Sequence, residues 1–379
     1  MSEPEELQEF EYREDWAREQ FNEMDSDLAV KLLGDAISKG KNLQDFLKDR
    51  WAIATELGQG LIEKGIIKVG TEDSKFRDVL AIGIDSSRQL PYRILNTYFC
   101  PITSAIVYFN GIDSEMKYDP NAPCKFFEES DLTPDQAIKR VKEEMYRCEV
   151  SAILRASTSI ASYGRESDQR GEVVIMIDGP LIDPPSEELY NEYVKERVTA
   201  LLACKESGAL VIGCVKSLEG HHFLEFLKSR QDLSELATMA EGFGSDPQLV
   251  PFIFHTIQSV SPMLETIPIE RRVPDWLVAK YKTHGLKNIF RIYLTMYGRV
   301  FCTEYFTLDE DPIELGKKVC QVVRAWSIPG FNAPLPVLAA HRRCNIKRGS
   351  AEFLYRELLT RALTWEEGAR MFGPLAGGP

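Results

Sequence analysis

Three short apolar runs, each bounded by polar residues, stand out in the middle of the chain. They cover residues 79–85, 172–178 and 209–215, and most of their side chains are aliphatic. Runs of this length that are apolar at successive positions are typical of strands buried on both faces. A helix expected at residues 186–206 separates the second run from the third. The pattern therefore predicts an α/β domain in which a helical crossover joins two parallel strands.

Apolar residues at helical spacing fill most of residues 5–65, where Gly40 and Gly58 are expected to interrupt the helices. This part is interpreted as a helical appendage that spans residues 1–75. Further helices are predicted at residues 133–159, 220–229, 312–326 and 336–363. Additional strands are predicted at residues 94–109, with a break at Pro101, and at residues 289–306, with a turn at Gly298.

Proline, glycine and polar residues interrupt this pattern at two places. Residues 111–131 are predicted to form a loop, and residues 229–285 a helical or irregular insertion. The main domain is expected to span residues 76–365 and to be followed by a flexible tail at residues 366–379. The predicted architecture is a mixed sheet flanked by helices.

Composition agrees with a globular protein that works in the cytoplasm. The chain has 379 residues, of which 44% are hydrophobic. No apolar run approaches the roughly 18 residues of a membrane-spanning helix, and the acidic N-terminus lacks the features of a secretory signal. The eight cysteines form no C-x-x-C pair, so buried free thiols in a reducing compartment are expected.

The net charge of −13 is distributed unevenly. Residues 1–30 carry eleven acidic and two basic side chains. Residues 270–300 carry seven basic against two acidic side chains, and residues 341–361 carry six against two. A nucleic-acid backbone responds to local patches rather than to the total charge, so the two basic segments are candidate DNA contacts. Solvated helix faces would give the same pattern.

Two of the predicted strands end on carboxylates, which are candidate catalytic or metal-binding groups. These are Asp85 and Asp178, and Glu149 lies on the helix expected between them. Carboxylates at the ends of buried strands fit a site for divalent metal ions, which can hydrolyse a phosphodiester. Each aspartate alone also fits a turn or a helix cap. His341, near the expected start of the last helix, could add a ligand, and Lys216 could hold a phosphate or be a solvated loop residue.

The ordered motifs resemble the NurA family of nucleases. They are I-G-I-D-S-S at 82–87, the helix with Glu149, I-D-G-P-L at 177–181, I-G-C-V-K-S at 212–217 and P-L-P-V-L-A-A-H at 334–341. The resemblance covers roughly residues 78–348. It implies a ribonuclease-H-like core and manganese-dependent hydrolysis of DNA, with Mg²⁺ as the alternative metal.

The same resemblance implies 5′-to-3′ exonuclease activity and endonuclease activity on single strands, at single- and double-stranded DNA ends. It further implies a homodimer that works with a HerA-like hexameric ATPase in end resection. By motif position, the catalytic and metal-binding residues would be Asp85, Glu149, Asp178 and His341. Glu143 or Glu144 could replace Glu149, and either Tyr293 or Tyr297 could be the tyrosine that the family has near its site.

DNA contacts are expected from basic residues around these motifs, namely Lys216, Arg271, Arg272, Lys287, Arg291, Arg342, Arg343, Lys347 and Arg348. The first motif reads D-S-S where the family commonly has D-G-S. This changes the turn but keeps the carboxylate. The alternative to an enzyme is a catalytically silent DNA-binding or ATPase-adaptor protein on the same fold.

Overall fold

The computed structural model describes residues 26–94, 97–127, 133–166, 172–182, 190–216, 218–271 and 275–363. The strands are β1 (Ile67–Val69), β2 (Leu80–Arg88), β3 (Tyr92–Ile94), β4 (Thr97–Asn110), β5 (Lys117–Asn121), β6 (Cys124–Phe127), β7 (Val173–Asp178), β8 (Ala209–Val215), β9 (Leu264–Thr266), β10 (Ile269–Glu270), β11 (Asn288–Met296) and β12 (Arg299–Thr307). Within the described ranges these twelve strands form one mixed sheet, in the order β1-β9-β11-β12-β8-β7-β2-β4-β3. Strand β10 pairs with β11, and β5 and β6 pair with β4.

The three apolar runs form the centre of this sheet, as predicted. Strand β7 lies between β2 and β8 and is parallel to both. All seven residues of β8 are buried, which explains why its sequence is apolar without alternation. The parallel register pairs Ile84 of β2 with Ile177 of β7, so the residues that follow them, Asp85 and Asp178, lie side by side. The other strand pairs of the sheet are antiparallel.

The helices are α2 (Ser26–Glu63), α3 (Pro134–Glu166), α4 (Tyr190–Glu206), α5 (His222–Ser229), α6 (Ser234–Ala240), α7 (Asp246–Thr256), α8 (Asp275–Thr283), α9 (Pro312–Ala325), α10 (Leu335–Cys344) and α11 (Arg348–Leu363). Within the described ranges, 3₁₀ turns lie at Ser74–Arg77, Gln231–Leu233 and Glu241–Phe243. In the described part of the chain, no helix combines the length and the apolar character needed to cross a membrane.

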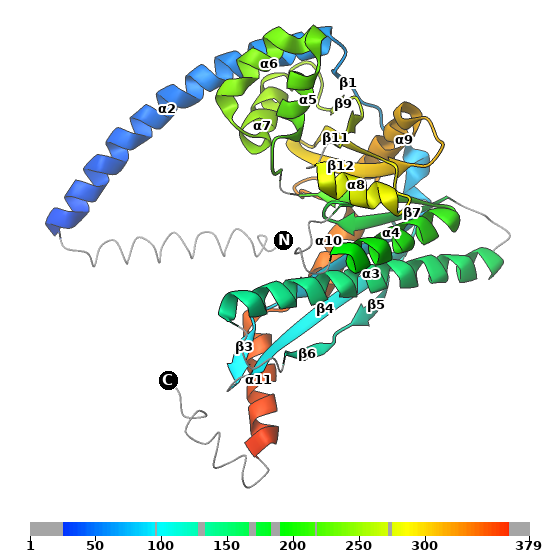
Figure 1. Cartoon of the computed structure of the whole chain (residues 1–379). Coiled ribbons are helices and arrows are strands. Elements are labelled where there is room, and N and C mark those ends of the chain that lie inside the picture. Colours follow the sequence, from blue (N-terminus) through cyan, green and yellow to red (C-terminus); the bar gives the residue numbers. More distant parts are fainter. Residues whose placement is uncertain are drawn as a thin grey trace.

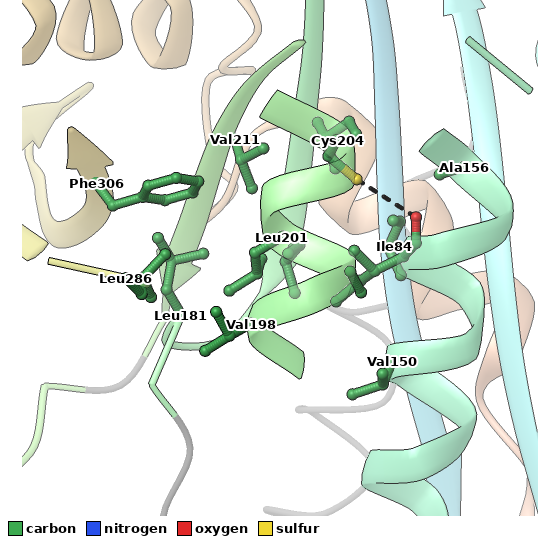
Figure 2. Packing of buried hydrophobic residues seen from close by; sticks show 14 of the residues in the cluster. Ile84, Val150, Ala156, Leu181, Val198, Leu201, Cys204, Val211, Leu286 and Phe306 are labelled. Carbon is green, nitrogen blue, oxygen red and sulfur yellow. Dashed lines mark hydrogen bonds between the residues drawn. The ribbon is translucent and has the colours of Figure 1, made fainter. Parts of the chain in front are cut away.

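Two apolar layers cover the central strands. One layer contains buried residues of α3, α4 and α8 against one face of β2, β7 and β8. Figure 2 shows part of it, with Val198 and Leu201 of α4 near Val150 and Ala156 of α3 and near Ile84 of β2. The other layer contains α9 and α10, whose Val323 and Val337 pack against the opposite face. The sheet therefore lies between two helical layers, with α3 and α4 side by side (Figure 1).

The N-terminal helix and the predicted insertion pack together at one end of the sheet. Helix α2 contacts α6 and α7, while its N-terminal half projects away from the body (Figure 1). Leu57 of α2 and Ile253 of α7 belong to a third buried cluster. Strand β1 pairs with β9, so residues from both segments extend the sheet itself. The predicted domain limits remain predictions.

Four sequence-based expectations about elements were wrong. Residues 117–121 and 124–127, predicted as loop, form β5 and β6 beside β4. Strand β4 continues through Pro101 rather than breaking there. Helix α2 continues through Gly40 and Gly58. At Gly58 a Cβ would lie 2.6 Å from Ile257, so the glycine allows close packing on the turn that follows α7 rather than ending the helix.

The fourth error concerns the last helix, which is two helices. Helix α10 ends at Cys344 and α11 begins at Arg348. Backbone carbonyls at the break accept hydrogen bonds from the sheet: Gln89 donates to Ile346 and Thr103 donates to Cys344. These tertiary contacts replace the helical bonds that the periodicity predicted. His341 consequently lies in the last turn of α10, not near the start of one long helix.

Candidate metal centre

Three of the predicted site residues converge at the carboxyl edge of the central strands. Asp178 is the last residue of β7, as expected, and His341 comes from α10. Asp85 lies within β2, which continues to Arg88 instead of ending on this aspartate. One potential ligand atom from each lies within 4.8 Å of the others. The Nδ1 atom of His341 is 2.8 Å from Oδ2 of Asp85 and 3.4 Å from Oδ2 of Asp178.

A close approach between helix and strand brings His341 to this edge. Helix α10 packs on β2 and β4. At Gly83 in β2, an added Cβ would lie 2.0 Å from the carbonyl oxygen of Pro336 in α10. Only glycine leaves room for the helix backbone at this point. The glycine of the I-G-I-D motif therefore determines how closely the helix that carries His341 approaches Asp85.

Burial and opposite charges shift the two carboxylates in different directions. Burial and the neighbouring charge of Asp178 raise the pKa of Asp85, against hydrogen bonds from His341 and Cys344. Burial also acts to raise the pKa of Asp178, but His341 and Lys216 outweigh it and lower that pKa. The Nζ atom of Lys216 is 2.5 Å from Oδ2 of Asp178. Of the two carboxylates, Asp178 is thus the one held more firmly in its charged form.

The imidazole of His341 is shifted toward its charged form. Its hydrogen bonds with Asp178 and Asp85 raise its pKa to about 9, although burial acts in the opposite direction. The side chain is 51% exposed, so solvent can reach the ring while Asp85 beside it is 8% exposed. The cluster therefore combines two buried or half-buried carboxylates with an accessible nitrogen.

This donor set fits a divalent metal ion. Two carboxylate oxygens and one imidazole nitrogen are ligands that Mn²⁺ accepts, and carboxylate oxygens also suit Mg²⁺. Two like-charged carboxylates this close need a cation between them or beside them. In the structure the imidazole of His341 and the ammonium of Lys216 supply that positive charge.

Glu149 lies beside this cluster but outside it. Its Oε2 atom accepts a hydrogen bond from Oγ of Ser86, the neighbour of Asp85, at 3.1 Å. Its Oε1 atom is 2.9 Å from Nη1 of Arg197. Glu143 and Glu144, the two alternatives to Glu149, have other partners. Glu144 pairs with Lys125, and Glu143 lies near Arg140. Among the three, Glu149 is the glutamate linked to the cluster.

Neither candidate tyrosine contacts the cluster among the hydrogen bonds of the described residues. The hydroxyl of Tyr293 donates to Oδ2 of Asp246 at 2.7 Å and is fully buried. Tyr297 lies in the exposed turn between β11 and β12 with a positive φ of 48°. The seven described cysteines are free and buried, as expected, and one of them, Cys344, donates from Sγ to Asp85.

The predicted DNA-contacting residues fall into two groups. Arg342, Arg343 and Lys347 are exposed in or just after α10, close in sequence to His341, and Lys287 is exposed before β11. Arg271 and Arg291 are buried and both pair with Glu304, at 2.9 and 2.7 Å, so their guanidinium groups face the interior. We omit these two from the proposed DNA surface. Arg272 lies outside the described residues, and Arg348 is described only as the start of α11.

Sequence reasoning missed Ser86, Arg197 and Glu304. Arg197 is fully buried in α4, and Glu304 is fully buried in β12. The available signal was a charged residue inside an apolar segment, since Glu304 stands in V-F-C-T-E-Y-F. A charge in such a segment needs partners, because an unpaired buried charge costs several kcal/mol.

The fold and the site together define a ribonuclease-H-like α/β protein, in which carboxylates on two neighbouring central strands meet a histidine from a late helix. Residues 79–346 match the NurA domain. The chain therefore belongs to the NurA family, as the motifs predicted. The fold prediction, a mixed sheet flanked by helices with an N-terminal helix, is confirmed.

The chain is also similar to solved structures. The crystal structure of the NurA nuclease from Sulfolobus solfataricus covers 90% of this chain and 98% of its own, with a TM-score of 0.53 and 15% identity. A structure of NurA bound to dAMP and manganese covers 91% and 99%, at 11% identity and a TM-score of 0.43. A structure of NurA with manganese covers 89% and 99%, at 12% identity and a TM-score of 0.41. A search of curated proteins gives no match.

Proposed function

We propose that this chain is a metal-dependent DNA nuclease in which Asp85, Asp178 and His341 hold Mn²⁺ or Mg²⁺. The observation that carries the proposal is the convergence of these three side chains within a NurA-family domain. A divalent ion bound there would lower the pKa of a coordinated water and stabilise charge on the scissile phosphate. The ribonuclease-H-like plan supports Asp85 as the central ligand.

The surrounding residues have distinct roles in this proposal. Lys216 keeps Asp178 ionised and neutralises part of the charge of the carboxylate pair. Glu149, predicted as a fourth ligand, instead holds the Ser86 hydroxyl next to Asp85 through its Oε2 atom. Arg342, Arg343 and Lys347 are exposed on the same C-terminal segment as His341 and bind the DNA backbone.

The finer activities follow from the family resemblance. We propose 5′-to-3′ exonuclease action together with endonuclease action on single strands. A HerA-like hexameric ATPase would be the partner, a homodimer the assembly and DNA end resection the process. The cleavage reaction can be tested without the ATPase.

The decisive experiment compares the wild type with Asp85→Ala on end-labelled single- and double-stranded DNA, with Mn²⁺ and with EDTA. RNA of the same sequence tests whether cleavage requires deoxyribose in the substrate. Asp113→Ala is the matched control, because Asp113 is an exposed aspartate in the turn after β4. Binding is measured in parallel by fluorescence anisotropy.

The expected result is Mn²⁺-dependent cleavage of DNA by the wild type and by Asp113→Ala. Asp85→Ala should bind DNA without cutting it. Equal cleavage by all three proteins would mean that the site lies elsewhere. Binding without cleavage by the wild type, with its ATPase partner present, would favour the silent adaptor instead.

A further inference from the structure

The backbone that directly follows Asp178 is held by charged side chains buried in the core. The amide N–H of Leu181 donates to Oε2 of Glu304 at 2.8 Å. The Nη1 atom of Arg271 donates to the carbonyl of Ile182 at 3.1 Å and also to Oε2 of Glu304 at 2.9 Å. Glu304 is fully buried and Arg271 is 8% exposed. Residues 181 and 182 are thus fixed from the β12 side by a carboxylate and its guanidinium partner.

A second buried guanidinium holds the same backbone through other atoms. Arg197 of α4 donates from Nη2 to the carbonyl of Pro180 at 2.9 Å and from Nε to the carbonyl of Leu181 at 2.8 Å. Its Nη1 atom pairs with Glu149, which accepts from Ser86 beside Asp85. One side chain therefore links the segment after Asp178 to the residue after Asp85.

Packing adds a third restraint on this segment. Leu181 is fully buried and lies near Val198 and Leu286 in the apolar layer (Figure 2). The amide of Gly179 donates to the carbonyl of Cys214 at 2.9 Å. At Gly213 in β8, an added Cβ would lie 2.9 Å from the oxygen of Gly179 and 3.0 Å from the nitrogen of Leu181. The segment lies so close to β8 that only glycine fits opposite it.

The charges in this arrangement are not an efficient way to stabilise a fold. A buried ion pair often contributes no more than apolar residues of similar volume, because desolvation offsets the attraction. Here one carboxylate serves two guanidinium groups, since Arg291 also pairs with Glu304. The charged groups instead restrain the backbone, because each hydrogen bond holds one backbone atom of residues 180–182 in a defined position. Removal of a polar group that orients a metal ligand typically lowers metal affinity by roughly 10–100-fold.

We propose that Glu304, with Arg271, is a positioning residue that fixes the segment after Asp178 and so aims the Asp178 carboxylate at the metal site. The inference rests on the proposed function, because it assigns a role to residues that support one of the proposed ligands. Glu304 and Arg271 act through the backbone, with no contact to metal or DNA. A metal site loses its productive geometry if the backbone that carries one of its ligands can shift by about 1 Å.

The experiment compares Glu304→Gln with Glu265→Gln in the full chain. Glu265 of β9 is the matched control, because it is also buried and pairs with buried Arg324 of α9 at 2.6 Å, away from Asp178. Mn²⁺ affinity is measured by calorimetry, and hydrogen exchange is followed in a peptide that contains residues 178–182. The exchange measurement needs neither metal nor DNA.

Glu304→Gln should weaken Mn²⁺ binding by about 10-fold and accelerate exchange at Leu181. Glu265→Gln should leave Mn²⁺ affinity within about 2-fold of the wild type, even if it lowers thermal stability equally. Cleavage by Glu304→Gln should rise toward the wild-type rate at saturating Mn²⁺, which a general loss of folding would not produce.

If folded Glu304→Gln binds Mn²⁺ as tightly as the wild type, the inference is overturned. If Glu304→Gln does not fold, Arg271→Lys provides the same comparison, because it keeps the charge but removes the planar guanidinium whose Nη1 atom donates to both Ile182 and Glu304. It should weaken Mn²⁺ binding as well, and unchanged affinity overturns the inference. A wild type that binds no Mn²⁺ would instead reject the proposed function, and the role of Glu304 with it.

Discussion

Gly83 of β2 and Pro336 of α10 touch so closely that a Cβ at residue 83 would lie 2.0 Å from the carbonyl oxygen of Pro336. Two residues further along β2 stands Asp85, and five residues further along α10 stands His341. The contact is therefore made by the same strand and helix that carry these two proposed ligands. It connects a packing requirement of the fold to the distance between two proposed ligands.

Gly83→Ala should separate α10 from β2 and weaken the metal centre. Crowding of a packed interior typically costs about 1–3 kcal/mol, and a clash with backbone is at the upper end because no side chain can rotate away. Urea unfolding and Mn²⁺ titration measure the two effects. Gly34→Ala is the control, because a Cβ there meets nothing within 4 Å on α2. Gly34→Ala should stabilise the chain by about 0.5–1 kcal/mol. A Gly83→Ala protein that is as stable as the wild type and binds Mn²⁺ as tightly would contradict the role assigned to Gly83.

His341→Gln should abolish most Mn²⁺-dependent cleavage. The amide can still form hydrogen bonds with Asp85, but it is a far poorer metal ligand than imidazole. We expect metal affinity to fall by at least the roughly 100-fold that loss of ligand support can cause. His284→Gln, at the end of α8, is the control histidine. Retention of full affinity by His341→Gln would remove this residue from the ligand set.

Metal binding should stabilise the folded chain. A ligand that binds only the native state adds about 2.7 kcal/mol at a concentration 100 times its Kd. Urea unfolding with Mn²⁺ at that concentration should show this gain, and EDTA should reverse it. Asp178→Asn, which keeps the size of the side chain, should respond much less. An equal response in the variant would show that Mn²⁺ binds at another site.

Removal of the exposed charges of Arg342, Arg343 and Lys347 should weaken DNA binding and its salt dependence. The slope of log K against log salt changes by about 0.9 for each phosphate contact with duplex DNA. The triple alanine variant in an Asp85→Ala background should therefore lose about 2–3 from that slope without cleavage interfering. Alanine at Lys31, Lys39 and Lys48 of α2 provides a control of equal charge. Identical slopes would exclude the α10 patch from the DNA surface.

The sequence predicted the centre of the fold because burial leaves a simple pattern there. Strands β2, β7 and β8 are covered on both faces, so their residues are apolar at successive positions. Strand β5 gives no such signal, since Lys117–Asn121 is largely exposed and contains Pro120. Its pairing with β4 depends on backbone hydrogen bonds, which any residue except proline can donate.

The two aspartates of the candidate site could be predicted from the sequence, but the residues that support them through tertiary contacts could not. Asp85 and Asp178 follow apolar runs and are visible in the sequence. The hydrogen bond between Glu304 and Leu181 joins residues 123 positions apart and depends on the register of β12 beside β8. A single sequence carries no record of that register. The break between α10 and α11 was missed for the same reason, because contacts with Gln89 and Thr103 produce it.

The separation of Asp85 and His341 along the chain has a consequence for synthesis. The two residues are 256 positions apart. A nascent chain on the ribosome therefore possesses both aspartates once residue 178 has been added, whereas the histidine follows only at residue 341. If the proposed activity requires all three ligands, a nascent chain that has not yet reached residue 341 cannot cut DNA.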